Sequence, residues 1–502
     1  MSKRAGRAKG KKEPLDQEKE ALIEECEKLL EKLVEERLKG GGSFADYEKS
    51  MMEIAHEVVR RRLQKKLQTV SDGFADRLAI DHRGDNDWHG LREGTARTYR
   101  RHCPGTVSYH SLVGRLTVKR HTYRECHRWG GSTYVPLDLE AGLMERMTPA
   151  LARSVAIGYA YMPLRRCEEL MLANGLVPPS RSTMDRAARD LGAYAVVCNR
   201  EVEPLLRSNE VLDRRARSIV VGLDRTGVPM RHGEEWRDEP HAGDLRRSRP
   251  RPVRKAELGG PVEWRMDYVG TVALVKEDGT LLTTRKYRLG AGRPPDEIVE
   301  RMMADVRHDL TQSPHLKIAV VQDGAPEMWN VVTNALSEEP LVKTWTETLD
   351  WYHLDERLSK CLDLCTTARN RESQRKRWHK QLLEGERGMH HVLRSLQRRA
   401  RSLDGTAAEE IKTHVGYMQR HLNRTAYATY LREGGPIGSG ITEGACKSVV
   451  GARAKRSGQR WSKRGLTAAL HLRAIHESDR FAGFWPFFAG RYRANVVALG
   501  GN

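Results

Sequence analysis

The chain has 502 residues, of which 39% are hydrophobic, and this length and composition predict roughly three globular domains and exclude global disorder. Its 87 Lys and Arg residues outnumber its 67 Asp and Glu residues, which gives a formal net charge of +20. Such a surplus favours an extended polyanionic partner over a small substrate, with nucleic acid first and an anionic membrane surface second.

The sequence offers no signal for membrane insertion or export. No apolar run approaches the ~20 residues that a membrane span needs, and the basic start MSKRAGRAKGKK is not followed by the apolar stretch of a signal peptide. The eight cysteines are scattered without the dense spacing of a disulfide framework, which predicts reduced thiols. We therefore expect a cytoplasmic protein with no membrane partner.

Residues 1–70 combine a basic tail with a helical region. Apolar residues recur at three-to-four spacing within 16–39, which predicts an amphipathic helix that ends at three glycines, and a second helical pattern covers 44–67. Residues 71–97 are polar and rich in Gly, Asp and His, so we expect a linker there.

The next two predicted units are small. Residues 98–138 alternate polar and apolar side chains, which predicts a small β unit. Residues 139–200 contain three short helical segments with a tight turn before the third, a pattern typical of a helix-turn-helix. The third segment, SRSTMDRAARDL, offers Arg181 and Arg186 to a DNA groove, although an ordinary solvated helix face has the same composition.

Residues 215–352 predict the first part of an α/β core. The expected strands and helices, in chain order, are strands at 218–223, 262–275 and 281–289, a helix at 295–310, a strand at 316–321, a helix at 326–338 and a strand at 342–349. This alternation indicates a mixed sheet flanked by helices. The Arg- and Pro-rich residues 231–254 are expected to form a mobile loop, 353–432 are helical, and a glycine-rich loop opens one more helix within 433–502.

Three carboxylates occupy notable positions in this pattern. Asp224 ends the first predicted strand, Asp323 follows the fourth, and Glu443 lies in the first turn of the late helix. Displacement at a phosphodiester is promoted by two Mg²⁺ ions, which prefer carboxylate oxygens, so three acids from separate elements are a sufficient protein contribution. Alternatively, the two aspartates are turn residues and Glu443 complements a helix dipole.

Four segments carry a resemblance that covers roughly residues 101–502. They are GLDRTGVPM, VVQDGAPEMWN, LDWYHLDERL and GSGITEGACKSVVGARAKRSGQRWS. In this order and in these strand or helix contexts they resemble bacterial insertion-sequence transposases of the ISKra type, which are DDE transposases.

The resemblance implies a ribonuclease-H-like mixed sheet core with an all-helical insertion, preceded by helical and helix-turn-helix regions. It implies Asp224, Asp323 and Glu443 as the metal-binding triad for two Mg²⁺ ions, with Mn²⁺ as a substitute. The implied function is binding of an element's terminal inverted repeats, followed by metal-dependent cleavage and transfer of a DNA strand into target DNA. Two DNA ends must be held together, so we expect a nucleoid-associated homo-oligomer on double-stranded DNA, with the 16–39 helix as a candidate contact.

Basic residues after Glu443 are candidates for DNA binding. Lys447 lies one turn further along the helix, where it contacts a phosphate or simply pairs with Glu443. The segment RAKRSGQRWSKR suits backbone tracking plus base stacking. Its candidate residues are Arg453, Lys455, Arg456, Arg460 and Trp461. A core position for Trp461 is the alternative.

Two further motifs are weaker. His353, in LDWYHLDERL, is a neighbour of the active site or a packing histidine. In related transposases, the segment before the helix-turn-helix resembles a zinc ribbon with paired Cys-x-x-Cys motifs. In this sequence the second cysteine of each pair is missing, so only Cys103 and Cys126 remain, next to His102 and His127. Adjacent residues rarely chelate one zinc ion well, so we expect a degenerate, metal-free unit.

Two rival functions remain open. The first is a catalytically inactive, transposase-derived DNA-binding protein, which the three intact acids disfavour. The second is a simple metal nuclease without strand transfer, against which the predicted N-terminal DNA-binding region argues.

Overall fold

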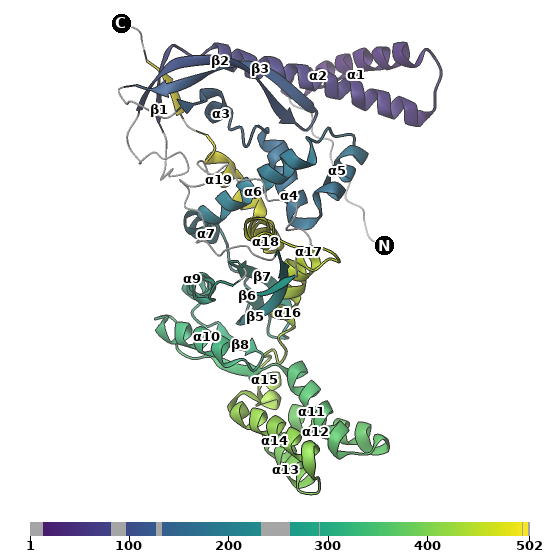
Figure 1. Cartoon of the computed structure of the whole chain (residues 1–502), viewed down its shortest axis with the longest axis vertical. Coiled ribbons are helices and arrows are strands. Elements are labelled where there is room, and N and C mark those ends of the chain that lie inside the picture. The colour runs from purple at the N-terminus through teal and green to yellow at the C-terminus, as the bar shows by residue number, and fades with distance from the viewer. Residues whose placement is uncertain are drawn as a thin grey trace, which may run out of the picture.

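The computed structural model describes residues 14–81, 97–126, 133–231, 262–290, 292–493 and 495–499. The molecule is elongated, with two sheets, one near the upper end and one near the middle, and a group of helices at the lower end (Figure 1). The predicted mixed α/β composition is therefore confirmed. Within the described residues, no helix has the length and apolar character needed to cross a bilayer.

Two long helices open the described chain. Helix α1 (Pro14–Leu38) packs on α2 (Phe44–Asp72), which begins at Ser43 with a reciprocal cap between Ser43 and Asp46. Residues 71–97 were expected to form a linker, and this is wrong for Arg77–Asp81, which form strand β1. Residues 82–96 lie outside the described part.

A five-stranded antiparallel sheet includes β1 and has the order β10-β1-β2-β3-β4. The other strands are β2 (Arg97–Ser111), β3 (Gly114–Glu125), β4 (Thr133–Tyr134) and β10 (Asn495–Ala498). The predicted β unit thus gains two strands that sequence patterning missed, one before it and one from the end of the chain. Buried Leu78, Ile80 and Tyr99 belong to its core.

The three helices predicted for 139–200 are present and are accompanied by two more. Their bounds are α3 (Pro136–Glu140), α4 (Pro149–Tyr161), α5 (Leu164–Ala173), α6 (Arg181–Val197) and α7 (Asn199–Ser208). Helix α6 packs along α18 (Lys463–Glu477) so closely that a Cβ at Gly192 would meet the Cβ of Ala468 at 2.4 Å. One hydrophobic core therefore joins these helices to the C-terminal part of the chain.

The second sheet has the order β7-β6-β5-β8-β9. Its strands are β5 (Ser218–Met230), β6 (Glu263–Val275), β7 (Leu281–Arg288), β8 (Lys317–Gln322) and β9 (Thr346–Leu349). The β5–β6 and β6–β7 pairs are antiparallel, and the β5–β8 and β8–β9 pairs are parallel. Residues 232–261, which include most of the predicted mobile loop, lie outside the described part.

Helices cover both faces of this sheet. Helices α9 (Asp296–Gln312) and α10 (Pro326–Glu338) bury Met302 and Trp329 against one face. On the other face, Ile441 of α16 (Gly440–Ala445) packs against Val220 and Val321. The chain continues through a π-helical turn (Cys446–Gly451), α17 (Ala452–Ala454), α18 and α19 (Phe481–Gly490).

Residues 353–432 are helical, as predicted, and lie at the lower end of the molecule in Figure 1. The helices are α11 (Trp351–Cys365), α12 (Ala368–Glu384), α13 (Gly388–Ala400), α14 (Gly405–Arg420) and α15 (Tyr427–Arg432). They share a core that includes Leu354, Trp378, Val392 and Ile411.

Candidate active site

Asp224 lies within β5 rather than at its end, so the predicted end of this strand is wrong. Strand β6 pairs with β5 over its full length and opposes Asp224 with Val269, which is why the strand continues to Met230. Strand β8, however, pairs only with Ser218–Val221. Asp224 therefore lies just beyond the end of the β5–β8 pairing, where β5 pairs only with β6.

The carboxylate of Asp224 is half-buried. It accepts hydrogen bonds from the backbone N–H of Arg225, at 2.7 Å, and from the thiol of Cys446. Burial raises the pKa of Asp224, and the nearby carboxylate of Asp323 acts in the same direction. Asp224 and Asp323 thus lie within electrostatic reach of each other.

Asp323 follows β8 in a tight loop. Its Oδ1 accepts a hydrogen bond from the backbone N–H of Ala325 at 2.9 Å, and its carbonyl accepts one from the indole N–H of Trp329 at 2.5 Å. A Cβ at Gly324 would meet the Tyr417 hydroxyl of α14 at 2.0 Å. The helical region is therefore packed directly over the loop that carries Asp323.

Asp350 organises the neighbouring elements, and the sequence analysis missed it. This buried residue caps α11: its Oδ2 accepts from the backbone N–H of His353 at 2.9 Å and from the imidazole Nδ1 at 2.6 Å. Its Oδ1 accepts from the backbone N–H of Ser439 at 2.5 Å, in the loop before α16. Its position just after a short strand and before a helix was a usable capping signal.

The same bonds set the charge state of this pair. Burial opposes ionisation of Asp350, but the hydrogen bonds from His353 and Ser439 lower its pKa below the ordinary value. The hydrogen bond to Asp350 raises the pKa of His353, and the carboxylates of Asp323 and Asp224 act in the same direction. His353 is therefore a cation-forming neighbour of both aspartates, and it is 47% exposed rather than packed in the core.

Glu443 lies on a helix that is docked against β5. A Cβ at Gly222 would meet Thr442 Oγ1 at 2.0 Å, so this close approach requires glycine. Glu443 itself is directed to Lys447, with an Oε1–Nζ distance of 2.7 Å. The ion pair considered for Lys447 is thus what the structure contains.

The donor set has the chemistry that Mg²⁺ requires, since all three predicted ligands are carboxylates. Within the described residues, however, no group of three or more His, Cys, Asp or Glu side chains is close enough together to hold a metal ion. Glu443 would have to leave Lys447 to complete the set. An exposed i,i+4 pair of this kind contributes only about 0.3–0.5 kcal/mol, so breaking it costs little.

The basic segment after Glu443 divides into buried and exposed residues. Two predicted DNA-binding residues are largely buried: Arg453 is 3% exposed and Trp461 is 8% exposed, so neither lies on the open surface. Lys455 bonds to the hydroxyl of Thr226, and Arg456 donates to the carbonyl of Ala452 at 3.0 Å. The prediction of an exposed position is wrong for Arg453 and for Trp461. Arg453 donates to the carbonyl of Tyr159 on α4, and the backbone of Trp461 pairs with the end of β5.

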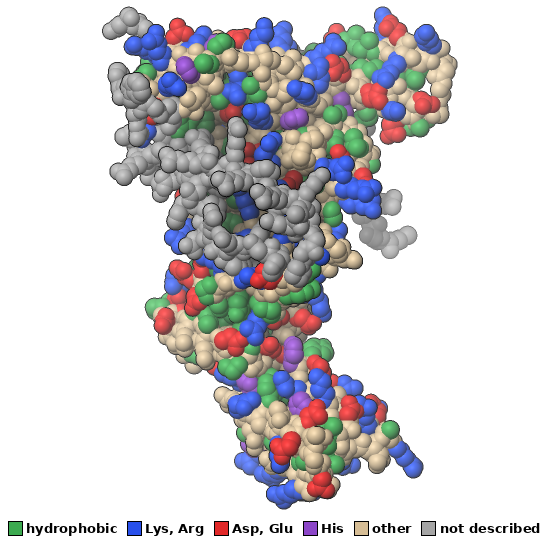
Figure 2. All heavy atoms as spheres, in the orientation of Figure 1, with side chains coloured by type: hydrophobic (Ala, Val, Ile, Leu, Met, Phe, Trp, Pro, Cys, Tyr) green, Lys and Arg blue, Asp and Glu red, His purple; other side chains and the backbone are tan. Residues whose placement is uncertain are grey.

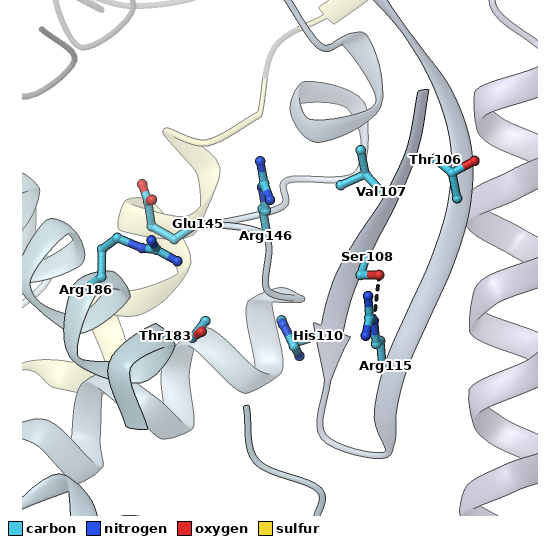
Figure 3. Close-up of a pocket in the computed structure, with 9 residues that line it drawn as sticks. All are labelled: Thr106, Val107, Ser108, His110, Arg115, Glu145, Arg146, Thr183 and Arg186. Atoms are coloured by element: carbon cyan, nitrogen blue, oxygen red, sulfur yellow. Dashed lines mark hydrogen bonds between the residues drawn. The ribbon is translucent and has the colours of Figure 1, made fainter. Parts of the chain in front are cut away.

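Arg186 lines a cavity of about 590 Å³ between α6 and the β2–β3 hairpin. Figure 3 shows Arg115, Arg146 and His110 around the same space. Glu145 and Arg146 have φ angles of 49° and 62°, in a two-residue turn closed by hydrogen bonds between Met144 and Met147. Burial raises the pKa of Glu145 to about 7. Three arginines and one acid line the cavity, which is therefore basic. Arg181, the other predicted DNA-binding residue of α6, does not line it and is paired with Glu168 at 3.0 Å.

The two cysteines of the predicted degenerate zinc unit do not meet. Cys103 lies at an irregularity of β2, opposite Thr122, whereas the N–H of Cys126 bonds to the carbonyl of Thr98. Five residues of extended strand separate Thr98 from Cys103, roughly 16 Å. His127 lies outside the described residues.

No family model and no curated protein matches this chain. Among solved structures, it is similar to the Drosophila P element transposase strand transfer complex, with 12% identity and a TM-score of 0.23 over 68% of this chain and 83% of that chain. Similarity at this level decides neither fold nor function.

Proposed function

We propose that this protein is a DDE transposase that binds the terminal inverted repeats of its own element and catalyses metal-dependent strand cleavage and strand transfer. The supporting observation is the convergence of three elements. Asp224 on β5 and Asp323 directly after β8 lie within electrostatic reach of each other. The helix that carries Glu443 contacts β5 at Gly222, and Cys446, the next residue after this helix, bonds to Asp224 itself.

In this proposal, Asp224, Asp323 and Glu443 would hold two Mg²⁺ ions, or Mn²⁺ as a substitute. Bound there, the ions would supply an activated oxygen nucleophile and stabilise the leaving oxyanion. His353, held by Asp350, would donate to a phosphate oxygen near the two aspartates. Lys447, once released by Glu443, would be a second cation for the same strand.

DNA binding is supported by charge. Figure 2 shows Lys and Arg side chains over the upper part of the molecule, and the cavity around Arg186 concentrates basic groups between a helix and a hairpin. Phosphate contacts of this kind hold a duplex in place without reading its sequence. Leu22, Leu29 and Leu33 of α1 are exposed, which supports the helix as a contact between copies on DNA.

The proposal is tested by cleavage of a labelled duplex that carries the element's terminal repeat, in Mg²⁺ or in EDTA. We expect nicking at the end in Mg²⁺ and a loss of at least 10³-fold in rate with Asp224→Ala, which corresponds to about 4 kcal/mol of barrier. Glu300→Ala, which removes an exposed carboxylate from α9, is the matched control and should cleave normally.

A DNA-binding protein without catalysis is the second candidate, and the Glu443–Lys447 ion pair favours it. Tight, specific binding of the repeat by both the native protein and Asp224→Ala, without nicking by either, would establish it. Nicking without joined product would instead indicate a nuclease.

A further inference from the structure

A second cavity, of about 400 Å³, lies where α4, α6 and the end of β5 meet the segment after α17. Four arginines line it, with one acid: Arg189, Arg231, Arg453, Arg460 and Asp185. Asp185 is already paired with Arg189. Among the described residues that line the cavity, no acidic side chain is left to pair with Arg231 or Arg453.

Arg453 is the distinctive member of this set. Its Nε donates to the carbonyl of Tyr159 at 2.9 Å, and its guanidinium lies over the rings of Trp461 and Tyr159 at 4.5 and 5.6 Å. Its Nη1 is buried without a hydrogen-bond partner, and no acidic side chain in the described part of the chain acts on its charge. Burial lowers its pKa to about 10, although Tyr159 opposes this shift.

A buried cation without a counter-charge is unfavourable, and proteins normally pair such groups or provide them with a ligand. Guanidinium groups match phosphate oxygens in shape and charge. We infer that this cavity binds a phosphate group of a nucleic-acid strand, with Arg453 as its buried charge and Arg231 and Arg189 at its wall. This inference rests on the proposed DNA-processing function and extends it to a second contact.

The cavity has a fixed position relative to Asp224. The backbone N–H of Arg231 donates to the carbonyl of Trp461 at 2.9 Å, and the N–H of Trp461 donates to the carbonyl of Pro229 at 3.0 Å. Strand β5 runs from Asp224 to this joint over seven residues, about 23 Å at 3.3 Å per residue.

The first test measures thermal unfolding of the full chain in potassium phosphate and in potassium chloride at equal ionic strength. A ligand that binds only the folded state raises Tm, so phosphate should raise Tm for the native protein but not for Arg453→Met. Arg394→Met, which removes an exposed arginine of α13 outside the cavity, should keep the phosphate effect. An equal phosphate effect in all three proteins, or none in the native protein, overturns the inference.

Arg231→Gln is a second variant that tests the inference if Arg453→Met does not fold, because Arg231 is only half-buried and its replacement disturbs the core less. Its affinity for a duplex is measured against salt concentration. Loss of one phosphate contact should reduce the slope of log affinity against log salt by about 0.9. Arg394→Gln, exposed on α13 at the lower end of the molecule and outside the cavity, should leave the slope unchanged.

The two arms separate the sources of phosphate and the two proposals. If Arg231→Gln leaves the salt slope unchanged while phosphate still raises the Tm of the native protein, the cavity binds free phosphate. That result overturns the proposal that it binds a nucleic-acid strand. The Tm arm needs no cleavage, so a phosphate effect that depends on Arg453 supports the cavity even where Asp224→Ala shows no catalytic role. Cleavage without any phosphate effect refutes the cavity alone.

Discussion

At the scale of single residues, the Asp350–His353 pair controls a charge beside the two aspartates. Asp350→Asn should lower the pKa of His353 toward 6.5, because the hydrogen bond to a carboxylate is the largest cause of its elevation. The raised pKa means that protonated His353 contributes stability fully below about pH 6.5. This contribution is lost as pH rises through the folded-state pKa.

The measurement is an NMR titration of the histidine side chains, combined with urea unfolding at pH 6 and pH 8. The native protein should lose more stability than His353→Asn between these pH values. Asp404→Asn, which changes the N-cap residue of α14 in the helical region, is the control and should leave the titration of His353 where it is. An unshifted His353 in Asp350→Asn would contradict the assigned role.

At the scale of elements, the docking of α16 on β5 depends on the absence of a side chain at Gly222. Gly222→Ala should lower the free energy of unfolding by about 1–3 kcal/mol, because its Cβ overlaps Thr442 Oγ1 and approaches the carbonyl of Val321 at 3.2 Å. Adding Thr442→Ala should recover part of the loss. Denaturant unfolding of the two single variants and the double variant measures this coupling.

Gly444 provides the matched control on the same helix, since a Cβ there would meet no atom within 4 Å. Gly444→Ala should keep or raise stability through helix propensity. Equal destabilisation at Gly222 and Gly444 would mean that the close approach of α16 to β5 is unimportant.

At the scale of the whole molecule, the C-terminal strand β10 joins the sheet near the start of the chain. Four residue pairs connect β10 to β1, and Val496 packs against the core around Leu78 and Ile80. Deleting residues 495–502 should lower the unfolding free energy by about 1–4 kcal/mol, at roughly 0.2–1 kcal/mol per cross-strand pair. Hydrogen exchange should accelerate in β1 but not in β5, which belongs to the other sheet.

Point substitutions give the control for this deletion. Val496→Ala should reproduce part of the loss, because Val496 contacts the core, whereas Val497→Ala should have little effect, because Val497 is 46% exposed. Unchanged exchange in β1 after the deletion would show that β10 adds nothing to the sheet.

The sequence by itself determined the elements whose causes are local. The region 353–432 was correctly predicted to be helical, and the apolar runs placed β5, β6, β7 and β8 to within a few residues, except where β5 continues past Asp224. The order of strands and helices also predicted the mixed sheet. It placed Asp323 directly after a strand and Glu443 in the first turn of a helix.

Only the tertiary structure decided which of these residues meet. The burial of Arg453 and Trp461 comes from packing between segments about 230 to 300 residues apart in the chain, and a run of basic residues does not indicate such packing. The strand pairing of β10 and the role of Asp350 likewise depend on partners from distant segments. Local patterns fix backbone conformation, whereas a buried contact exists only where two distant surfaces fit each other.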